Sequence, residues 1–448
     1  MVAVFFGLRT IAFGVSLLWR GIRMLATRHQ PIQAAQARRD GRGADVVRWV
    51  TAVVVLGLAA GASVVSHELR SGEPVLDAFY ATPSDLPDEP GQLLRSSAWP
   101  GTAPDGATVT RILYTTTDSN GAPAVASAIV VLPDQPQATP RTVIAWDHGT
   151  TGVARSCAPS LMTDMFQIQG IPAVDAAIAN GWAIVATDYT GQGTEGDFPY
   201  LIGEGEGRSA LDAVRAAQQL QGANLSADTV IWGHSQGGHA ALWTAKLAPT
   251  YAPELNILGV AALSPAADPW ALANVIQEKG VQGALGVIVS WVLVPYSQTY
   301  SDVRVTDYVA PAGRGLVYEY ASRCVKNTSL LVSVLSSMAL SQDQPLYVSS
   351  LIDDAAGRRL RENEATGPFD VPVFVAWGSA DEVIPASLQH DYVAELCSSG
   401  QALEYQEYPG YTHMGVLDEV SGLPHDLVAW TQDRIDGTPA VDNCSGHA

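Results

Sequence analysis

Hydrophobic and polar positions follow two alternating patterns from about residue 105 onward. Short runs rich in Val, Ile and aromatic residues predict buried strands, whereas apolar residues at intervals of three and four predict helices. In the helical stretch 206–220, for example, Leu211, Val214 and Leu220 fall on one face. The predicted strands are 108–117, 125–132, 142–146, 183–188, 229–232, 258–263, 371–377 and 403–408, and the predicted helices include 174–180, 206–220, 238–247 and 424–435.

The order of these elements predicts the architecture. Strands that alternate with helices form a mostly parallel sheet whose two faces are covered by helices. The first two predicted strands are joined by a turn at Ser119-Asn120-Gly121, so an antiparallel hairpin opens the sheet. The sequence therefore predicts an α/β fold with a mostly parallel central sheet.

About 100 residues with helical patterns separate the strand that ends near residue 263 from the one that starts at 371. Such a segment is too long for a plain connection. Its apolar run at 281–294 has three interpretations, a membrane span, a core helix or the wall of a cap, and we favour the cap because the run is short for a span. We therefore divide the chain into an N-terminal export signal or membrane anchor at 1–70, a core in two parts at 71–268 and 367–448, and a helical cap at 269–366.

Two apolar stretches lie near the N-terminus, at 2–19 and 46–65, and the second has about the length of a membrane span. Because arginines precede it, it has the pattern of either a signal peptide with a long preface or an uncleaved signal anchor. The first stretch is compatible with a second span, an amphipathic surface helix, or translation from an over-extended start codon with Met24 as the alternative start. We therefore predict export of the remaining chain, with cleavage and anchoring both left open.

Charge and cysteine content limit the ligands, metal sites and disulfides that we expect. The net charge is −20, and residues 71–448 hold 16 basic and 42 acidic residues, a balance that repels nucleic acid and favours neutral or apolar ligands. No CxxC motif or His/Cys cluster is present, so we expect no metal site and no cofactor. An even number of cysteines in an exported chain predicts two disulfides, for which three pairings are possible. The cysteines are Cys157, Cys324, Cys397 and Cys444.

The segment Gly233-His234-Ser235-Gln236-Gly237 matches the pattern G-x-S-x-G and lies between a predicted strand and a predicted helix. In that context the pattern forms a sharp turn that exposes the serine hydroxyl, and only small residues two positions away let strand and helix approach closely. The start of the helix also directs N–H groups toward negative charge that develops on a substrate. We therefore predict the α/β-hydrolase fold with Ser235 as the nucleophile.

A serine hydroxyl is a weak nucleophile and needs a histidine base that is oriented by a carboxylate. In this fold the three residues occur in the order Ser, acid, His. Asp381 follows the strand 371–377, and His413 lies in the loop after the last strand, so we predict the triad Ser235, Asp381 and His413. The alternatives are a runner-up acid and two histidines on predicted helices: Glu382, His390 and His425.

The tetrahedral intermediate of acyl transfer needs two N–H donors. We predict the backbone of Gln236 as one donor, because it immediately follows the nucleophile. The other donor is predicted to be the backbone of Thr150, with Thr151 as the alternative, in the loop 147–152.

Other polar residues near these motifs have structural interpretations. His148 is predicted to support its loop, whereas His234 and His239 are predicted to be packing or pocket residues. The turn 188–193 is interpreted either as part of the pocket or as an ordinary turn.

Several separated motifs occur in one order along the chain. They are His148-Gly149-Thr150-Thr151-Gly152, Cys157-Ala158-Pro159-Ser160, Asp188-Tyr189, Gly233-His234-Ser235-Gln236-Gly237-Gly238, Gly378-Ser379-Ala380-Asp381 and His413. With these motifs the chain resembles the secretory lipase family over about residues 75–444. The resemblance implies triacylglycerol lipase or broad carboxylesterase activity, a helical cap inserted late in the sheet, and the disulfides Cys157–Cys324 and Cys397–Cys444. The two-part apolar N-terminus departs from the simple secretory leader of that family.

The residues and the resemblance together predict an exported serine hydrolase that cleaves carboxylic esters of lipids through an acyl-enzyme intermediate. A lipid or small ester is the expected substrate, nucleic acid is not an expected partner, and the N-terminal apolar segments are candidates for membrane association. Two rival hypotheses stay open: a peptidase or acyltransferase with the same triad, and a non-catalytic binding protein with a hydrolase fold. The second rival is disfavoured because such proteins typically lose a triad member, and none is missing here.

Overall fold

A computed structural model describes residues 49–57, 59–61, 63, 75–166, 170–343 and 345–444. The chain divides into two compact units, Met1–Gly72 with Asn327–Ser329, and Glu73–Lys326 with Leu330–Ala448. Residues 49–57 are helical; the apolar stretch 46–65 is described only in part, and the stretch 2–19 lies outside the described residues. Within the described part of the chain, none of the helices combines the length and the apolar composition needed to cross a membrane.

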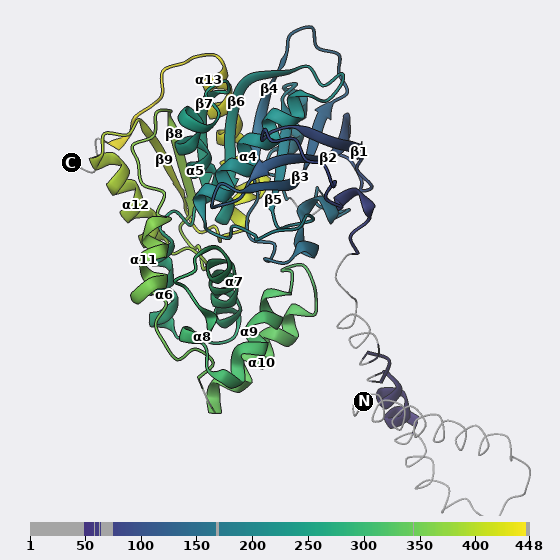
Figure 1. Ribbon diagram of the computed structural model, residues 1–448, viewed down its shortest axis with the longest axis vertical. Coiled ribbons are helices and arrows are strands. Elements are labelled where there is room, and N and C mark those ends of the chain that lie inside the picture. Colours follow the sequence, from purple (N-terminus) through teal and green to yellow (C-terminus); the bar gives the residue numbers. More distant parts are fainter. Residues whose placement is uncertain are drawn as a thin grey trace, which may run out of the picture. The chain divides into compact units, whose positions relative to one another are not determined.

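A nine-stranded mixed sheet forms the centre of the second unit (Figure 1). Its strands are β1 Leu93–Ala98, β2 Ala107–Thr117, β3 Pro123–Pro133, β4 Arg141–Asp147, β5 Ala183–Thr190, β6 Leu225–His234, β7 Asn256–Leu263, β8 Val373–Gly378 and β9 Leu403–Tyr408. They lie in the order β1-β2-β3-β5-β4-β6-β7-β8-β9. The three pairs among β1, β2, β3 and β5 are antiparallel and the other five are parallel, which confirms the predicted sheet.

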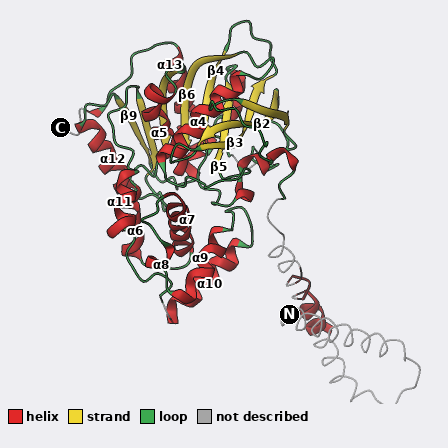
Figure 2. Cartoon of the chain, in the orientation of Figure 1, coloured by secondary structure: helices red, strands yellow, loops and turns green. Residues whose placement is uncertain are grey.

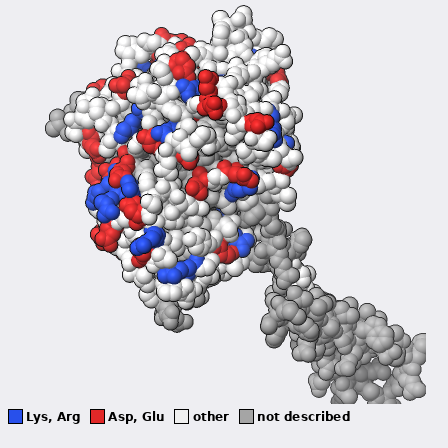
Figure 3. Space-filling view, in the orientation of Figure 1, with Lys and Arg blue, Asp and Glu red and all other residues white. Residues whose placement is uncertain are grey.

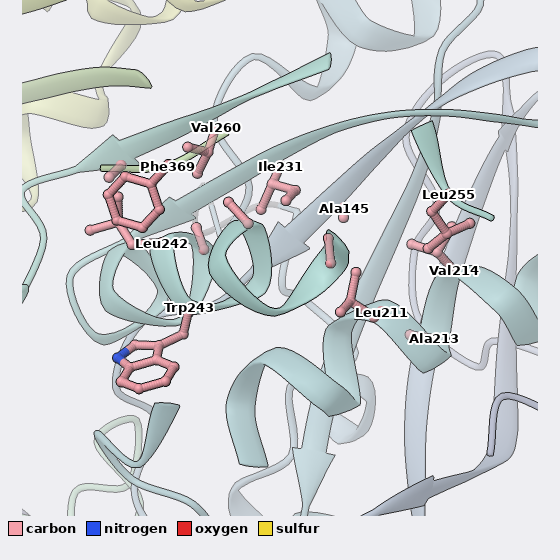
Figure 4. Close-up of a cluster of buried hydrophobic side chains, with 14 of the residues drawn as sticks. Ala145, Leu211, Ala213, Val214, Ile231, Leu242, Trp243, Leu255, Val260 and Phe369 are labelled. Carbon is pink, nitrogen blue, oxygen red and sulfur yellow. The ribbon is translucent and has the colours of Figure 1, made fainter. Parts of the chain in front are cut away.

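Helices cover both faces of this sheet (Figure 2). They are α3 Val174–Ala179, α4 Gly203–Gln218, α5 Gln236–Tyr251, α12 Ala386–Ser398 and α13 Leu423–Ile435. Successive residues of a strand point to opposite faces, so neighbours in β4 enter different cores. Ala145 packs in one core with Leu211 of α4 and Leu242 of α5 (Figure 4), whereas Ile144 packs in the other core with residues of α3 and α13. Burial on both faces explains the continuous apolar runs inside the central strands, such as VIAW in β4 and AIVA in β5.

The segment between β7 and β8 is helical, and we call it the helical insertion. Its helices are α6 Pro269–Lys279, α7 Ala284–Thr299, α8 Val305–Tyr308, α9 Arg314–Ala321, α10 Leu330–Asp343 and α11 Asp354–Glu362. Figure 1 shows them gathered together below the sheet. The apolar run at 281–294 falls largely in α7, whose Val287, Trp291 and Leu293 are buried in a third apolar core. This core packs the insertion against the rest of the fold, because it also contains Tyr189 of β5 and Ala240 of α5.

The sequence missed one strand and shortened another. β1 is a sheet edge whose residues are half-buried or exposed, so its LLRSSA sequence lacks the apolar run or clean alternation that predicts a strand. β6 begins at Leu225, before the predicted start at residue 229. The prediction missed the first residues of this strand because they include Ser226 and Asp228, which are polar and hydrogen-bond each other.

Two disulfides join the four cysteines in the pairing that the resemblance implied. Cys157 is bonded to Cys324 with a Cα–Cα distance of 5.2 Å, and Cys397 to Cys444 with 5.4 Å. The first bond links the loop after β4 to the helical insertion, and a backbone bridge between Gly152 and Cys324 strengthens the same contact. The position of the insertion relative to that loop is therefore fixed covalently.

Removing the first disulfide should destabilise the fold more than removing the second. In the chain-entropy description a bond that closes a longer loop stabilises more, and the two separations are 167 and 47 residues. We expect Cys157→Ala with Cys324→Ala to lower the free energy of unfolding by about 2–5 kcal/mol, about 1 kcal/mol more than Cys397→Ala with Cys444→Ala. Chemical denaturation of the two double variants measures this, and a larger loss for the C-terminal pair would contradict it.

Candidate active site

Ser235 lies in a strained turn between β6 and α5. Its φ is 59° and its ψ is −120°, a conformation that residues with a side chain rarely adopt. A Cβ at Gly233 would lie 1.9 Å from the Gly237 carbonyl oxygen, and a Cβ at Gly237 would lie 1.8 Å from the Asp147 carbonyl oxygen. Both glycines are therefore required for β6, α5 and the end of β4 to meet at this turn.

Asp381 and His413 form a buried pair at the ends of β8 and β9. His413 Nδ1 donates to Asp381 Oδ2 at 2.7 Å, and the other carboxylate oxygen accepts from the amides of Val383 and Ile384 at 2.9 and 2.8 Å. Burial alone would raise the pKa of Asp381, but these hydrogen bonds outweigh it, so its pKa lies below the ordinary value of 3.8. The carboxylate is therefore ionised at neutral pH and can hold the imidazole in one orientation.

His234 connects the serine turn to the loop that carries His413. Its Nε2 donates to the carbonyl oxygen of His413 at 3.0 Å, and the centroids of the two rings are 4.6 Å apart. Burial, together with the charge of His413, lowers the pKa of His234 to about 3, so this ring is neutral at pH 7. Among the described residues no hydrogen bond joins Ser235 Oγ to His413, a contact that in free enzymes often tightens only when substrate binds.

The alternative acid and bases have other partners. Glu382 accepts a hydrogen bond from the backbone amide of His413 at 3.1 Å rather than from its ring. His390 on α12 bonds Glu407, and His425 on α13 bonds its neighbour Asp426 at an exposed position. Of these candidates, Asp381 and His413 are the ones whose side chains are buried and bonded to each other.

The loop after β4 lies directly against the serine turn. A Cβ at Gly149 would be 3.5 Å from Ser235 Cβ and 3.0 Å from the His234 carbonyl oxygen. Within the described chain, the amides of Thr150 and of Gln236, the first residue of α5, have no hydrogen-bond acceptor. Free N–H groups beside a serine are what an oxyanion site needs.

Side chains fix the two threonines of this loop in different ways. Thr150 Oγ1 lies 2.8 Å from the Tyr200 hydroxyl, whereas Thr151 Oγ1 accepts from Gln192 Nε2 at 3.0 Å and the Thr151 carbonyl accepts from Val325 at 2.8 Å. Thr151 is thus held toward Gln192 and the helical insertion. Thr150 is the threonine whose backbone neighbours Gly149 beside the serine.

Buried polar residues hold the loop after β4 and the segment that follows Cys157. His148 Nδ1 donates to the Gly149 carbonyl at 2.7 Å, and burial lowers the pKa of this histidine to about 4, so it is neutral. Asp188 accepts from Ser127 Oγ at 2.6 Å and from both the amide and the hydroxyl of Ser160. Burial raises the pKa of Asp188 to about 6. This carboxylate holds the segment after Cys157, a role that sequence analysis missed because its serine partners are distant along the chain.

A small apolar pocket of about 50 Å³ lies between the helical insertion and the segment before α4. Tyr200 and Leu201 form one side of it, and Tyr200 is the residue whose hydroxyl contacts Thr150. The other side comes from helices of the insertion, including Ala273, Ile276 and Val292. The pocket therefore adjoins the loop that carries one of the free amides, and its lining suits a hydrocarbon group.

Comparisons with known proteins agree on one family. The family pattern described as Secretory lipase matches residues 158–443. Lipase A of Arthroderma benhamiae is 27% identical over 401 residues, which cover 83% of this chain and 81% of that protein. The secreted triacylglycerol lipase LIP3 of Malassezia globosa is 26% identical over 430 residues, which cover 88% of this chain and 89% of that protein.

The fold also matches solved structures. The crystal structure of Candida antarctica lipase A in its closed state superposes with a TM-score of 0.68 at 22% identity, covering 84% of this chain and 89% of that one. At this level of identity the likeness establishes the fold alone, and it confirms the α/β-hydrolase prediction.

Proposed function

The chain belongs to the secretory lipase family and is a carboxylic-ester hydrolase, and we propose that it cleaves lipid esters through an acyl group carried on Ser235. The observation that carries this proposal is the buried His413–Asp381 pair, 2.7 Å apart, whose loop is hydrogen-bonded to the turn that holds Ser235. The order of the three residues along the chain and the bond from His413 to Asp381 support this proposal, because a serine triad has both features.

In the proposed acylation step Ser235 Oγ attacks the ester carbonyl carbon while His413 Nε2 takes the hydroxyl proton. The imidazolium that forms is stabilised by ionised Asp381 through the bond to Nδ1. Negative charge develops on the carbonyl oxygen, which the amides of Gln236 and Thr150 stabilise. Collapse of the intermediate breaks the ester C–O bond, and the alcohol leaves with the proton from His413.

In the second step water replaces the alcohol. His413 removes a proton from water, the resulting hydroxide attacks the acyl carbon, and the Ser235 ester bond breaks with return of the proton to Oγ. Products are a free carboxylic acid and the enzyme as it began. A peptidase or an acyltransferase would share the acyl group on Ser235 and differ only in the leaving or accepting group.

The surroundings of the site support an apolar, uncharged substrate. The pocket beside Tyr200 is lined largely by Leu, Ile, Val and Ala side chains. On the face seen in Figure 3, acidic and basic side chains are interspersed, with no continuous basic surface that would attract a polyanion. We assign the pocket to the acyl chain of the substrate.

Filling this pocket should change the preferred acyl-chain length. Ala273 of α6 lines the pocket, and phenylalanine there would occupy space that a long chain needs. We expect Ala273→Phe to lower kcat/KM for p-nitrophenyl palmitate by about tenfold or more relative to p-nitrophenyl butyrate. Ala355→Phe on α11, outside the pocket lining, is the control. An equal loss with both esters would argue against the assignment.

Export is supported by the same comparisons. The family is described as secretory, and a relative that covers most of this chain is named as secreted. The two disulfides fit an oxidising compartment.

The proposal is tested by assaying the full chain with p-nitrophenyl esters of short and long acyl chains and by labelling it with a fluorophosphonate. We expect ester turnover, and label on Ser235 when the labelled peptide is mapped by mass spectrometry. Label without turnover of any ester would favour the peptidase or acyltransferase alternative. Neither turnover nor label in a folded protein would favour the non-catalytic alternative.

A further inference from the structure

A buried histidine and glutamate lie behind the serine turn and take no part in the mechanism above. His239 is in α5 and Glu206 is in the first turn of α4, and both side chains are fully shielded from solvent. His239 Nδ1 lies 2.6 Å from Glu206 Oε2, and His239 Nε2 lies 2.7 Å from the carbonyl oxygen of Asn363. Each ring nitrogen therefore faces an oxygen.

The hydrogen bonds indicate how the protons are distributed. A carbonyl oxygen only accepts, so His239 Nε2 carries a proton. Glu206 Oε1 accepts from Gln236 Nε2 at 2.9 Å and from the Leu201 amide at 3.1 Å, and the N-terminal end of α4 favours negative charge there. His239 Nδ1 and Glu206 Oε2 share a short hydrogen bond that is shielded from water.

The carboxylate of Glu206 also fixes a residue of the proposed oxyanion site. Gln236 is the first residue of α5, and its amide is one of the two free N–H groups. Its side-chain Oε1 is buried without a partner among the described residues, so the bond from its Nε2 to Glu206 is what orients the side chain. The peptide unit that carries this amide is held on its other side by the Ser235 carbonyl oxygen, which accepts from the amides of Gly238, His239 and Ala266. The bond to Glu206 adds a side-chain anchor to the same residue.

His239 connects the same cluster to the helical insertion. Asn363 follows the end of α11, and its carbonyl accepts from Trp243 Nε1 at 3.1 Å as well as from His239. The side chain of Asn363 accepts from the amide of Gly203, the first residue of α4, at 3.0 Å. The end of the insertion is thereby attached to both α4 and α5, the helix on which Figure 4 labels Trp243.

We propose that Glu206 and His239 are positioning residues, which hold the Gln236 amide in the oxyanion site and fasten it to the end of the helical insertion at Asn363. This inference rests on the proposed serine mechanism. The positioning acts through hydrogen bonds from Gln236 and His239 to Glu206.

The test compares two replacements of Glu206 in the full chain. Glu206→Leu removes the acceptor that faces Gln236, Leu201 and His239, and we expect kcat for p-nitrophenyl butyrate to fall by about 10- to 100-fold with KM changed by less than about threefold. Glu206→Gln keeps an oxygen toward Gln236 and Leu201, and its amide can donate to a neutral His239. We therefore expect this variant to keep kcat within about threefold of wild type.

Asp212→Leu is the matched control for lost stability. Asp212 is a second buried carboxylate of α4, and it accepts three hydrogen bonds, from Thr116, Tyr251 and Arg215, none of which belongs to the site. We expect its kcat to stay near the wild-type value. Equal losses of kcat in Glu206→Leu and Asp212→Leu, or a loss in Glu206→Leu that lies in KM alone, would overturn the proposal.

If Glu206→Leu does not fold, Gln236→Leu tests the positioning role instead. It retains the backbone amide and removes a single side-chain hydrogen bond, together with an oxygen that has no partner. We expect the same loss of kcat, and an unchanged kcat would refute the positioning role. A separate variant tests the proposed serine mechanism, which fails if Ser235→Ala keeps wild-type turnover. If Ser235→Ala is inactive while both Glu206→Leu and Gln236→Leu are fully active, the mechanism stands and only the positioning role fails.

Discussion

Ser235→Ala is expected to lower kcat for ester hydrolysis by at least about 10⁴-fold, because no other described hydroxyl occupies the strained turn. Alanine has the same Cβ as serine and can adopt the same backbone, with φ of 59°, without a new contact. The fold should therefore survive, and the loss should be confined to the chemical step. The activity that remains would come from the Gln236 and Thr150 amides acting on bound ester.

The measurement is kcat and KM of purified wild type and variant on p-nitrophenyl butyrate, together with a thermal unfolding curve for each. Ser226→Ala is the control, because this serine lies at the other end of β6 and its hydroxyl bonds Asp228. It should leave kcat unchanged. A folded Ser235→Ala protein that keeps more than about a tenth of the wild-type kcat would exclude Ser235 as the nucleophile.

The serine turn was predictable from sequence because its motif is short. Gly233 and Gly237 are separated by four positions, and a Cβ at Gly233 would lie 1.9 Å from the Gly237 carbonyl oxygen within the turn. A Cβ at Gly237 would lie 1.8 Å from the carbonyl oxygen of Asp147 in β4, a distant contact that the pattern does not report. The flanking strand and helix also carry clear periodic patterns, so the motif could be placed in its structural context without knowledge of the rest of the fold.

The proposed acid is harder to assign from sequence, because Asp381 and Glu382 are neighbours that follow the same strand. Pattern alone gives the position to within a residue or two. The structure separates them by which atoms of His413 each one contacts: Asp381 accepts from the ring, and Glu382 accepts from the backbone amide. Which carboxylate contacts the imidazole depends on the direction of each side chain in the turn. The hydrophobic periodicity of the sequence does not report that direction.

Contacts between distant parts of the chain were beyond prediction. Glu206 and His239 are 33 positions apart, and His239 and Asn363 are 124 apart. Sequence analysis could assign His239 only to packing or to the pocket, because one buried histidine has no pattern that names its partner. Asp188 and Ser160 are linked in the same way across 28 positions. These buried polar contacts connect elements that the hydrophobic pattern places only approximately.

Asp381→Asn should lower kcat nearly as much as loss of the nucleophile, by about 10⁴-fold at neutral pH. An asparagine oxygen can still accept from the Val383 and Ile384 amides, as the carboxylate does at 2.9 and 2.8 Å. Its NH₂ group then faces His413 Nδ1, which must accept rather than donate. The proton moves to Nε2, so the nitrogen that should take the serine proton is already protonated, and the imidazolium formed during attack loses its counter-charge.

Glu382→Gln is the matched control for this variant, because its carboxylate contacts only the backbone amide of His413 among the groups of the site. A glutamine oxygen can accept the same bond, so kcat should stay within about threefold of wild type. Both variants are assayed on p-nitrophenyl butyrate from pH 5 to 9. The wild-type pKa of Asp381 lies below 3.8, so its carboxylate is ionised throughout this range. The difference in kcat between wild type and Asp381→Asn should therefore persist across the range. If Glu382→Gln lost activity and Asp381→Asn kept it, the runner-up would be the orienting acid, and the 2.7 Å contact between Asp381 and His413 would have only a structural role.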